Sequence, residues 1–474
     1  MNLEANAGPK LHRVLGTWDL VLLNVAAIVW LRWLSTAAKI GPSSLALWVL
    51  GLIIFFVPVA LAVLELSSRL PGEGGLYLWA KAAFGDAHAF IAGWTYWIAN
   101  LVFFPLLLLF GAGVSLYIAG DTWLALAENA WYNAGYCLAV LWGATLLNIA
   151  GLERAKWLQN IGGIATWTAA GFLVIGGGFA WHEFGAATAF TLSAVIPDLG
   201  SMATMTTLAT IALAYGGLEL GPILGGEIKE PRKRIPRAIL ISVALVTAMY
   251  MAGTAALLIA LPAAQIDLVG GIPQALAAVG DRLGIPAFGP VTAGLIALGN
   301  LGGVGAWMTG TARLPFVVGV DRYLPPALAA LHPRYSTPYV ALLTQGAITS
   351  MVLLAAVSGT TMHEAFIVLT DMTLILGFLP LLYLFAALPV LRRRAAGRNE
   401  GITLIPGGAL GCGLTCGLGF AATLLAIVTS LVPPDVSSNP GLFFLKVIGG
   451  CLLMIGTGLA FYARGRAGRI SATR

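Results

Sequence analysis

Hydrophobic runs of about 20 residues alternate with short polar segments along almost the whole chain, and a helix of that length spans the hydrocarbon core of a bilayer. Charged residues, glycine and proline bound twelve such runs. The pattern therefore predicts an all-α polytopic membrane protein with twelve transmembrane helices. We place them at residues 17–39, 44–66, 87–118, 134–151, 158–181, 202–226, 237–261, 287–313, 339–357, 365–391, 411–432 and 443–463.

The composition argues against a soluble fold, since 59% of the 474 residues are hydrophobic and only 10% are charged. The segments between the runs are too short to hold a separate catalytic domain. All four cysteines lie within apolar runs, and their spacing fits neither a metal site nor a disulfide framework: Cys137, Cys412, Cys416 and Cys451. We therefore expect no metal and no cofactor.

Basic residues are distributed unevenly between the two sides of the predicted bundle. With both termini placed in the cytoplasm, 22 of the 26 Lys and Arg residues lie on the cytoplasmic side, as the positive-inside rule requires. The net charge of +6 therefore indicates a multi-pass topology in the cell membrane rather than a nucleic-acid partner. The first sixteen residues lack the features of a cleaved secretory signal.

Two charged segments have local interpretations. Glu65 and Arg69 lie one helical turn apart at the inner end of the second run, so we expect them to form a pair. The basic segment RRRAAGR, residues 392–398, is typical of chain that contacts anionic lipid headgroups on the cytoplasmic leaflet.

The most informative stretch runs from Thr210 to Arg237, where Gly216 and Gly217 interrupt an apolar run and Glu219 follows. Adjacent glycines weaken a helix by about 1 kcal/mol each relative to alanine. Irregular backbone at membrane depth is tolerated where it lines a cavity, and an ionisable side chain there marks a functional site. The stretch therefore predicts a binding site. The alternative is a packing notch whose carboxylate is satisfied by a neighbouring helix.

Three inter-helical segments carry motifs: ELSSRLPGEGGLYLWAKAAFG from Glu65, GGEIKEPRKRIPRAI from Gly225, and ARLPFVVGVDRYLP from Ala312. Their order and spacing resemble the amino acid–polyamine–organocation (APC) superfamily of amino-acid permeases. The agreement covers roughly residues 10–390. Several motifs in register are a strong signal, whereas one alone is weak.

The resemblance implies a LeuT-like fold, in which a five-plus-five inverted repeat is followed by two extra helices. Such proteins transport by rocking one group of helices against another, so that a single site faces each side in turn. The implied division is a cytoplasmic tail at 1–16, a transport core at 17–391 with repeats at 17–181 and 202–391, helices 11 and 12 at 392–463, and a cytoplasmic tail at 464–474.

The resemblance also implies a substrate site between broken helices 1 and 6. The helix 6 motif falls on residues 213–219, with Leu213 where an aromatic cap is frequent. In helix 1, Trp30, Leu31 and Arg32 stand where the family has glycines, so this helix is either less broken or opens differently. The implied substrate-binding residues are Ala26, Ala27, Ile28, Trp30, Tyr96, Asn100, Leu213, Tyr215, Gly216, Gly217 and Trp307.

Arg32 has three interpretations. Asp371 lies at a similar depth in helix 10, so the two side chains are candidates for an ion pair that gates the site, similar to the outer gate of sodium-coupled relatives. Alternatively, Arg32 binds a substrate carboxylate with two parallel hydrogen bonds. The third interpretation is an arginine that extends outward beside Lys39 to reach the headgroups.

Few residues in the sequence are candidates for coupling substrate transport to the movement of an ion. Where proton-coupled relatives carry a lysine in helix 5, this chain has Ala165 and Thr166. All five histidines fall in loops or at the ends of the runs, so no imidazole relay crosses the membrane. Glu219 is the candidate proton carrier, because a carboxylate buried away from cations can take up a proton near neutral pH. Otherwise transport is exchange or facilitated diffusion without a coupling ion.

The sequence thus favours a secondary transporter that moves amino acids or related small amines by alternating access, with the lipid bilayer, a small-molecule substrate and H+ as candidate partners. One alternative is a polyamine or cationic-amine carrier, against which Arg32 argues. Another is a transporter-like sensor that binds substrate without moving it. An enzyme is not expected, since the runs contain no nucleophile–base pair, metal motif or nucleotide loop. The substrate, direction and oligomeric state are left open.

Overall fold

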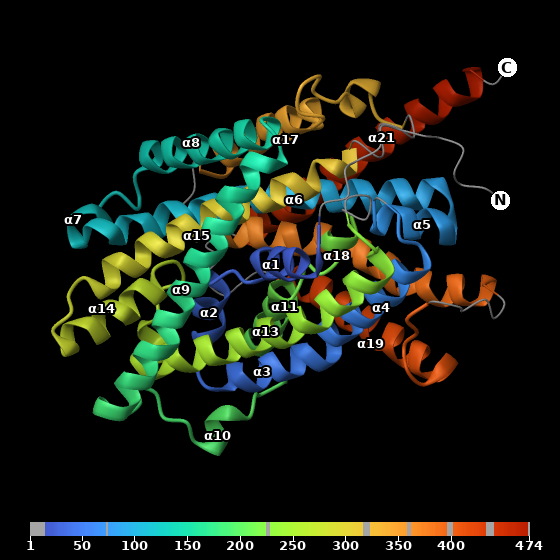
Figure 1. Ribbon diagram of the computed structural model, residues 1–474. Coiled ribbons are helices and arrows are strands. Elements are labelled where there is room, and N and C mark those ends of the chain that lie inside the picture. Colours follow the sequence, from blue (N-terminus) through green and yellow to red (C-terminus); the bar gives the residue numbers. More distant parts are fainter. Residues whose placement is uncertain are drawn as a thin grey trace.

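The computed structural model describes residues 15–72, 74–223, 228–315, 323–357, 362–395, 402–432 and 440–472. These residues form a bundle of helices (Figure 1). They contain no strand, and only one isolated β-bridge, between Leu15 and Ile228, joins two extended segments in this part of the chain. The predicted all-α class is confirmed.

Nine helices in the described chain are long and apolar enough to cross a membrane. One of them is continuous from α3 (Ser43–Gly51) through a π-helical segment, η1 (Leu52–Phe56), into α4 (Val57–Arg69). The others are α6 (Asp86–Leu116), α9 (Leu152–Phe184), α13 (Pro231–Ala260), α15 (Phe288–Thr311), α17 (Tyr339–Val357), α18 (Met362–Arg394), α19 (Gly408–Thr429), and the last, in which α20 (Pro440–Phe444) and η6 (Leu445–Gly449) lead into α21 (Gly450–Ala472).

The remaining predicted spans correspond to α8 (Ala130–Ile149) and to two interrupted helices. The count of twelve crossings therefore stays a prediction. Short helices connect the long ones: α5 (Leu76–Phe84), η2 (Tyr117–Ala119), α7 (Asp121–Leu124), α10 (Leu192–Val195), η4 (Ala263–Gln265), α14 (Gly271–Leu283) and η5 (Pro326–Ala329). In Figure 1, α7 and α14 lie at one end of the bundle, and α5 and the last turns of α21 lie at the other.

The two interrupted helices are the first and the sixth of the predicted spans. The first consists of α1 (Thr17–Ile28) and α2 (Arg32–Ala38), separated by Val29, Trp30 and Leu31. The sixth consists of α11 (Met202–Ala214) and α12 (Leu220–Ile223), separated by residues 215–219. The first helix is therefore broken even though glycine is absent from its break.

Helix α9 packs closely on α15 (Figure 1). The close packing depends on glycines that face each other across the contact. A Cβ built on Gly302 would lie 2.7 Å from the Cα of Gly162 and 2.8 Å from the carbonyl oxygen of Leu158. Both atoms belong to the backbone, so a rotamer change cannot relieve the clash. The absence of a side chain at this position lets the two helix backbones touch.

We expect Gly302→Ala to destabilise the protein by about 1–3 kcal/mol, because the added methyl group forces α9 and α15 apart. The measurement is thermal unfolding of purified protein in detergent. Gly294→Ala is the matched control, since it lies on the same helix and a Cβ there meets no atom within 4 Å. Equal melting temperatures for the two variants would show that the contact is unimportant.

Candidate functional site

The two helix breaks border a cavity inside the bundle, with about 520 Å³ of space between its walls, part of it open to solvent. Its walls come from both interrupted helices and from α6, α15 and α18. The lining is mainly aromatic and aliphatic, with few polar groups: Ala27, Trp30, Trp33, Tyr96, Ala99, Asn100, Phe103, Leu213, Gly216, Glu219, Trp307, Thr373, Gly377, Phe378 and Leu381.

Side-chain donors hold the break between α1 and α2 open. The indole N–H groups of Trp30 and Trp307 both donate to the carbonyl oxygen of Ala27, at 2.7 and 2.9 Å. The hydroxyl of Tyr250 lies 2.5 Å from the carbonyl oxygen of Ile28 and 3.1 Å from that of Ala214, the last residue of α11. These contacts satisfy carbonyls that a continuous helix would bond internally. They explain how the helix can be broken without glycine.

The break between α11 and α12 uses glycine and a carboxylate. Gly217 has φ +126°, a conformation that residues with a side chain rarely adopt. Its N–H donates to one carboxylate oxygen of Glu219 at 3.1 Å, and the hydroxyl of Tyr96 donates to the other at 3.1 Å. Glu219 is 4% exposed, and no ion pair is recorded for it among the described residues. The site therefore contains a buried carboxylate next to an interrupted helix.

Most of the predicted substrate-binding residues line the cavity: Ala27, Trp30, Tyr96, Asn100, Leu213, Gly216 and Trp307. The side chain of Ala26 lies outside the described residues. Leu213 occupies the wall as a partly buried side chain, where an aromatic cap is frequent in the family. The amide of Asn100 donates to the carbonyl of Tyr96 in its own helix at 2.7 Å.

Three of the predicted substrate-binding residues are not among the side chains and glycines that line this cavity: Ile28, Tyr215 and Gly217. The ring of Tyr215 stacks on Phe56 with a centroid distance of 4.4 Å, and its hydroxyl donates to the carbonyl of Trp48 at 3.2 Å. Ile28 and Gly217 pack against each other, since a Cβ on Gly217 would lie 3.0 Å from the Ile28 side chain. The Tyr215 side chain is therefore turned toward the helix that contains Trp48 and Phe56, and Gly217 and Ile28 fill the contact between the two interrupted helices.

The predicted ion pair between Arg32 and Asp371 is not formed. Asp371 hydrogen-bonds with Ser430, directly after α19, so its carboxylate lies on a face of α18 turned toward α19. The Arg32 guanidinium instead stacks over Trp33, with its carbon 3.8 Å from the ring centroid. Arg32 is completely buried, so the prediction that it extends outward to the headgroups is also wrong.

Residues that the sequence did not indicate complete the cavity, and one of them follows from helical spacing. Tyr96 and Asn100 were predicted, and Phe103 lies one further turn along the same face of α6. On α18, Thr373, Gly377 and Leu381 recur at intervals of four, but no residue of that face was predicted. Trp33 lines the cavity because α2 begins at Arg32, directly after the break.

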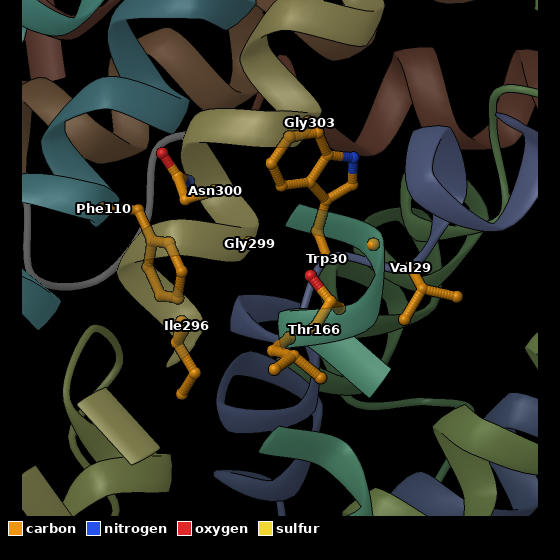
Figure 2. Close-up of a pocket in the computed structure, with 10 residues that line it drawn as sticks. Val29, Trp30, Phe110, Thr166, Ile296, Gly299, Asn300 and Gly303 are labelled. Carbon is orange, nitrogen blue, oxygen red and sulfur yellow. The ribbon is translucent and has the colours of Figure 1, made fainter. Parts of the chain in front are cut away.

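A second, smaller cavity of about 360 Å³ lies on the other side of the first break, between α6, α9 and α15 (Figure 2). Figure 2 shows the Trp30 ring beside Gly303 and the side chains of Thr166 and Asn300 at its walls. The Thr166 hydroxyl donates to the carbonyl of Gly162 at 3.0 Å, and the Asn300 amide donates to the carbonyl of Leu107 at 3.0 Å. These polar groups therefore already have main-chain partners.

Comparisons with known proteins agree with this geometry. The chain is 30% identical over 446 residues to an uncharacterised transporter of Legionella pneumophila, covering 94% of this chain and 95% of that protein. It is 24% identical over 396 residues to the glutamate/gamma-aminobutyrate antiporter of Lactococcus lactis, covering 81% and 77%. The crystal structure of MhsT in complex with L-phenylalanine superposes with a TM-score of 0.64 at 13% identity, over 89% of this chain and 100% of MhsT.

The structural likeness to MhsT shows the LeuT-like fold that the sequence predicts. The family model described as amino acid permease matches residues 15–455, which include both helix breaks and every residue that lines the cavity. The chain therefore belongs to the amino acid permease family.

Proposed function

We propose that the protein is a secondary transporter that exchanges amino acids or related small amines across the cell membrane, with the cavity between the two helix breaks as its substrate site. The observation that carries this proposal is the cavity itself, where a buried carboxylate and a wall of aromatic rings meet two interrupted helices. Interrupted helices of this kind supply the binding groups in transporters that work by alternating access.

The chemistry of the lining suits an amine. Glu219 offers a carboxylate to an ammonium group, and the two form a charge-assisted hydrogen bond in a water-poor site. The ring of Phe103 lies 6.0 Å from that of Trp30 and 5.4 Å from that of Trp307, centroid to centroid. Faces of such rings attract a cation by about 0.5–2 kcal/mol. Together these groups select a small molecule with an amine.

Exchange is favoured because the conformational change costs more free energy when the site holds no substrate. Without substrate, the Glu219 carboxylate is buried with two neutral hydrogen-bond donors and no cation recorded among the described residues. An uncompensated buried charge is unfavourable, so the conformational change is easier when an ammonium occupies the site. A proton on Glu219 would serve the same purpose, which is our proposal for any coupling to H+. The glutamate/gamma-aminobutyrate antiporter among the relatives is also an exchanger by name.

The family resemblance supports two finer proposals on organisation. Residues 17–181 and 202–391 form the two inverted repeats, and each contains one of the interrupted helices as its first member. Both termini lie in the cytoplasm, which follows from the distribution of Lys and Arg. Reporter fusions at the C-terminus, active only in the cytoplasm or only outside it, test this orientation.

The proposed function is tested by counterflow in proteoliposomes. Vesicles loaded with one unlabelled amino acid or amine are expected to take up the labelled compound transiently, and efflux is expected to be slow without external substrate. A thermal-shift screen of the same compounds selects the pair to use. Binding without counterflow for every compound that stabilises the protein would identify a sensor and reject the transporter.

A further inference from the structure

Arg32 is a buried cation for which the described residues provide no counterion. The side chain is 0% exposed, and none of its three guanidinium nitrogens has a hydrogen-bond partner in the described structure. Its guanidinium carbon lies 3.8 Å from the centroid of Trp33, 5.2 Å from that of Phe103 and 5.7 Å from that of Phe366. Aromatic rings therefore cover its flat face, while Asp371, the predicted partner, bonds elsewhere.

This arrangement needs an anion to complete it. A guanidinium carries five N–H donors in its plane, and stacking on a ring leaves those donors unsatisfied. Buried polar groups in proteins nearly always have partners, so a side chain with all its donors unpaired indicates a missing ligand. The planar fork of donors matches a carboxylate, which accepts two parallel hydrogen bonds.

Arg32 and the substrate cavity share two aromatic neighbours. Trp33 and Phe103, the two rings closest to the guanidinium, both line the cavity that contains Glu219. The guanidinium therefore lies against two residues of the cavity lining, although Arg32 itself is outside that lining. Arg32 and Glu219 approach the same cavity from the two interrupted helices, one from α2 and one beside α12.

Three main-chain N–H groups near the first break already have hydrogen-bond partners. The N–H of Trp30 donates to the carbonyl of Ile28 at 2.9 Å, that of Trp33 to Trp30 at 3.0 Å, and that of Leu34 to Leu31 at 3.0 Å. On the opposite side, the N–H of Gly217 donates to Glu219. A carboxylate that enters the cavity therefore finds a stronger donor in the unpaired guanidinium than in these backbone groups.

We propose that Arg32 is the receptor for the carboxylate of the substrate, and that the transporter therefore takes amino acids in preference to amines that lack a carboxylate. This inference rests on the proposed function. The ammonium of the amino acid pairs with Glu219 and its carboxylate with Arg32, so one zwitterion neutralises both buried charges. The polyamine alternative lacks the group that Arg32 requires.

The first test compares ligands that differ only by the carboxylate. Purified protein is titrated in thermal-shift assays with arginine and agmatine, ornithine and putrescine, phenylalanine and phenethylamine, and serine and ethanolamine. Any amino acid that binds is expected to do so roughly 10- to 100-fold more tightly than its amine, as a charge-assisted bidentate contact implies. Equal affinity within each pair would overturn the proposal.

The second test replaces the cation itself. Arg32→Met removes a buried unpaired charge from the empty protein, so the melting temperature without ligand is expected to stay equal or rise. Amino-acid binding is expected to weaken roughly 10- to 100-fold, and amine binding to stay unchanged. Lys39→Met is the matched control, because Lys39 follows α2 and is exposed. Wild-type preference in Arg32→Met would overturn the proposal.

An inorganic anion such as chloride presents the same chemistry to Arg32, so each titration is repeated with methanesulfonate in place of chloride. Binding that disappears without chloride in the wild type would assign Arg32 to a bound inorganic ion instead. Counterflow separates this inference from the proposed function. Wild-type vesicles that exchange amino acids and amines equally reject the role of Arg32 alone, whereas vesicles that exchange neither reject transport.

Discussion

Glu219→Gln is expected to reduce counterflow roughly 10- to 100-fold while leaving the protein folded, because the substitution removes the acidic group that lines the cavity and keeps its shape. The glutamine carbonyl can still accept the N–H of Gly217, and its amide can donate to the hydroxyl of Tyr96, so both local contacts have a replacement. The measurements are initial counterflow rates over a range of pH and the melting temperature in detergent.

Tyr96→Phe is the matched control for this variant. It removes the hydroxyl that donates to Glu219 at 3.1 Å and keeps the negative charge, so we expect a smaller loss of rate. A Glu219→Gln protein with wild-type rate and wild-type pH dependence would remove Glu219 from the mechanism. A variant that no longer folds would instead assign the carboxylate a structural role at the break.

Glu65→Gln is expected to lower the free energy of unfolding by about 3–5 kcal/mol, the cost of breaking a buried ion pair. The Glu65 carboxylate is completely buried and bonds to Arg69 Nη2 at 2.8 Å, to Arg392 Nε at 2.7 Å, and to Arg392 Nη2 at 2.7 Å. It also accepts the N–H of Ile405 at 2.9 Å. A neutral amide removes the negative charge that both arginines share.

The matched control for Glu65 is Arg393→Ala, which removes an exposed arginine next to Arg392. Thermal unfolding in detergent distinguishes the two variants. The network joins α4, the end of α18 and the segment before α19, so its loss is expected to loosen three parts of the chain at once. A melting temperature equal to that of Arg393→Ala would show that the network contributes little.

The ion pairs of Glu65 show what local sequence rules can predict and what they cannot. The pair between Glu65 and Arg69 was predicted from their spacing and is confirmed, because residues four apart on a helix must be neighbours. Arg392 was assigned to the lipid headgroups with the rest of its basic segment, yet it pairs with Glu65 at a separation of 327 residues. Spacing along one helix carries no information about a partner that distant.

The helix breaks show a similar contrast. The break after Ala214 was predicted because Gly216 and Gly217 are intrinsically poor helix formers. The break at Trp30 was left open, since nothing in that segment weakens a helix by itself. It depends on Tyr250, which reaches the carbonyl of Ile28 from a helix 222 residues further along the chain.

Hydrophobic periodicity and glycine placement alone determined the all-α membrane class and the second helix break, because these properties depend on local backbone preference and on burial in lipid. The resemblance to a known family, rather than any local pattern, indicated about half of the cavity lining. The tertiary structure decided the direction of side chains. It turned Tyr215 away from the cavity, paired Asp371 with Ser430, and gave the Arg32 guanidinium no partner in the part of the chain that the structure describes. Such outcomes depend on which helices pack side by side, and contacts between distant segments follow from no single stretch of sequence.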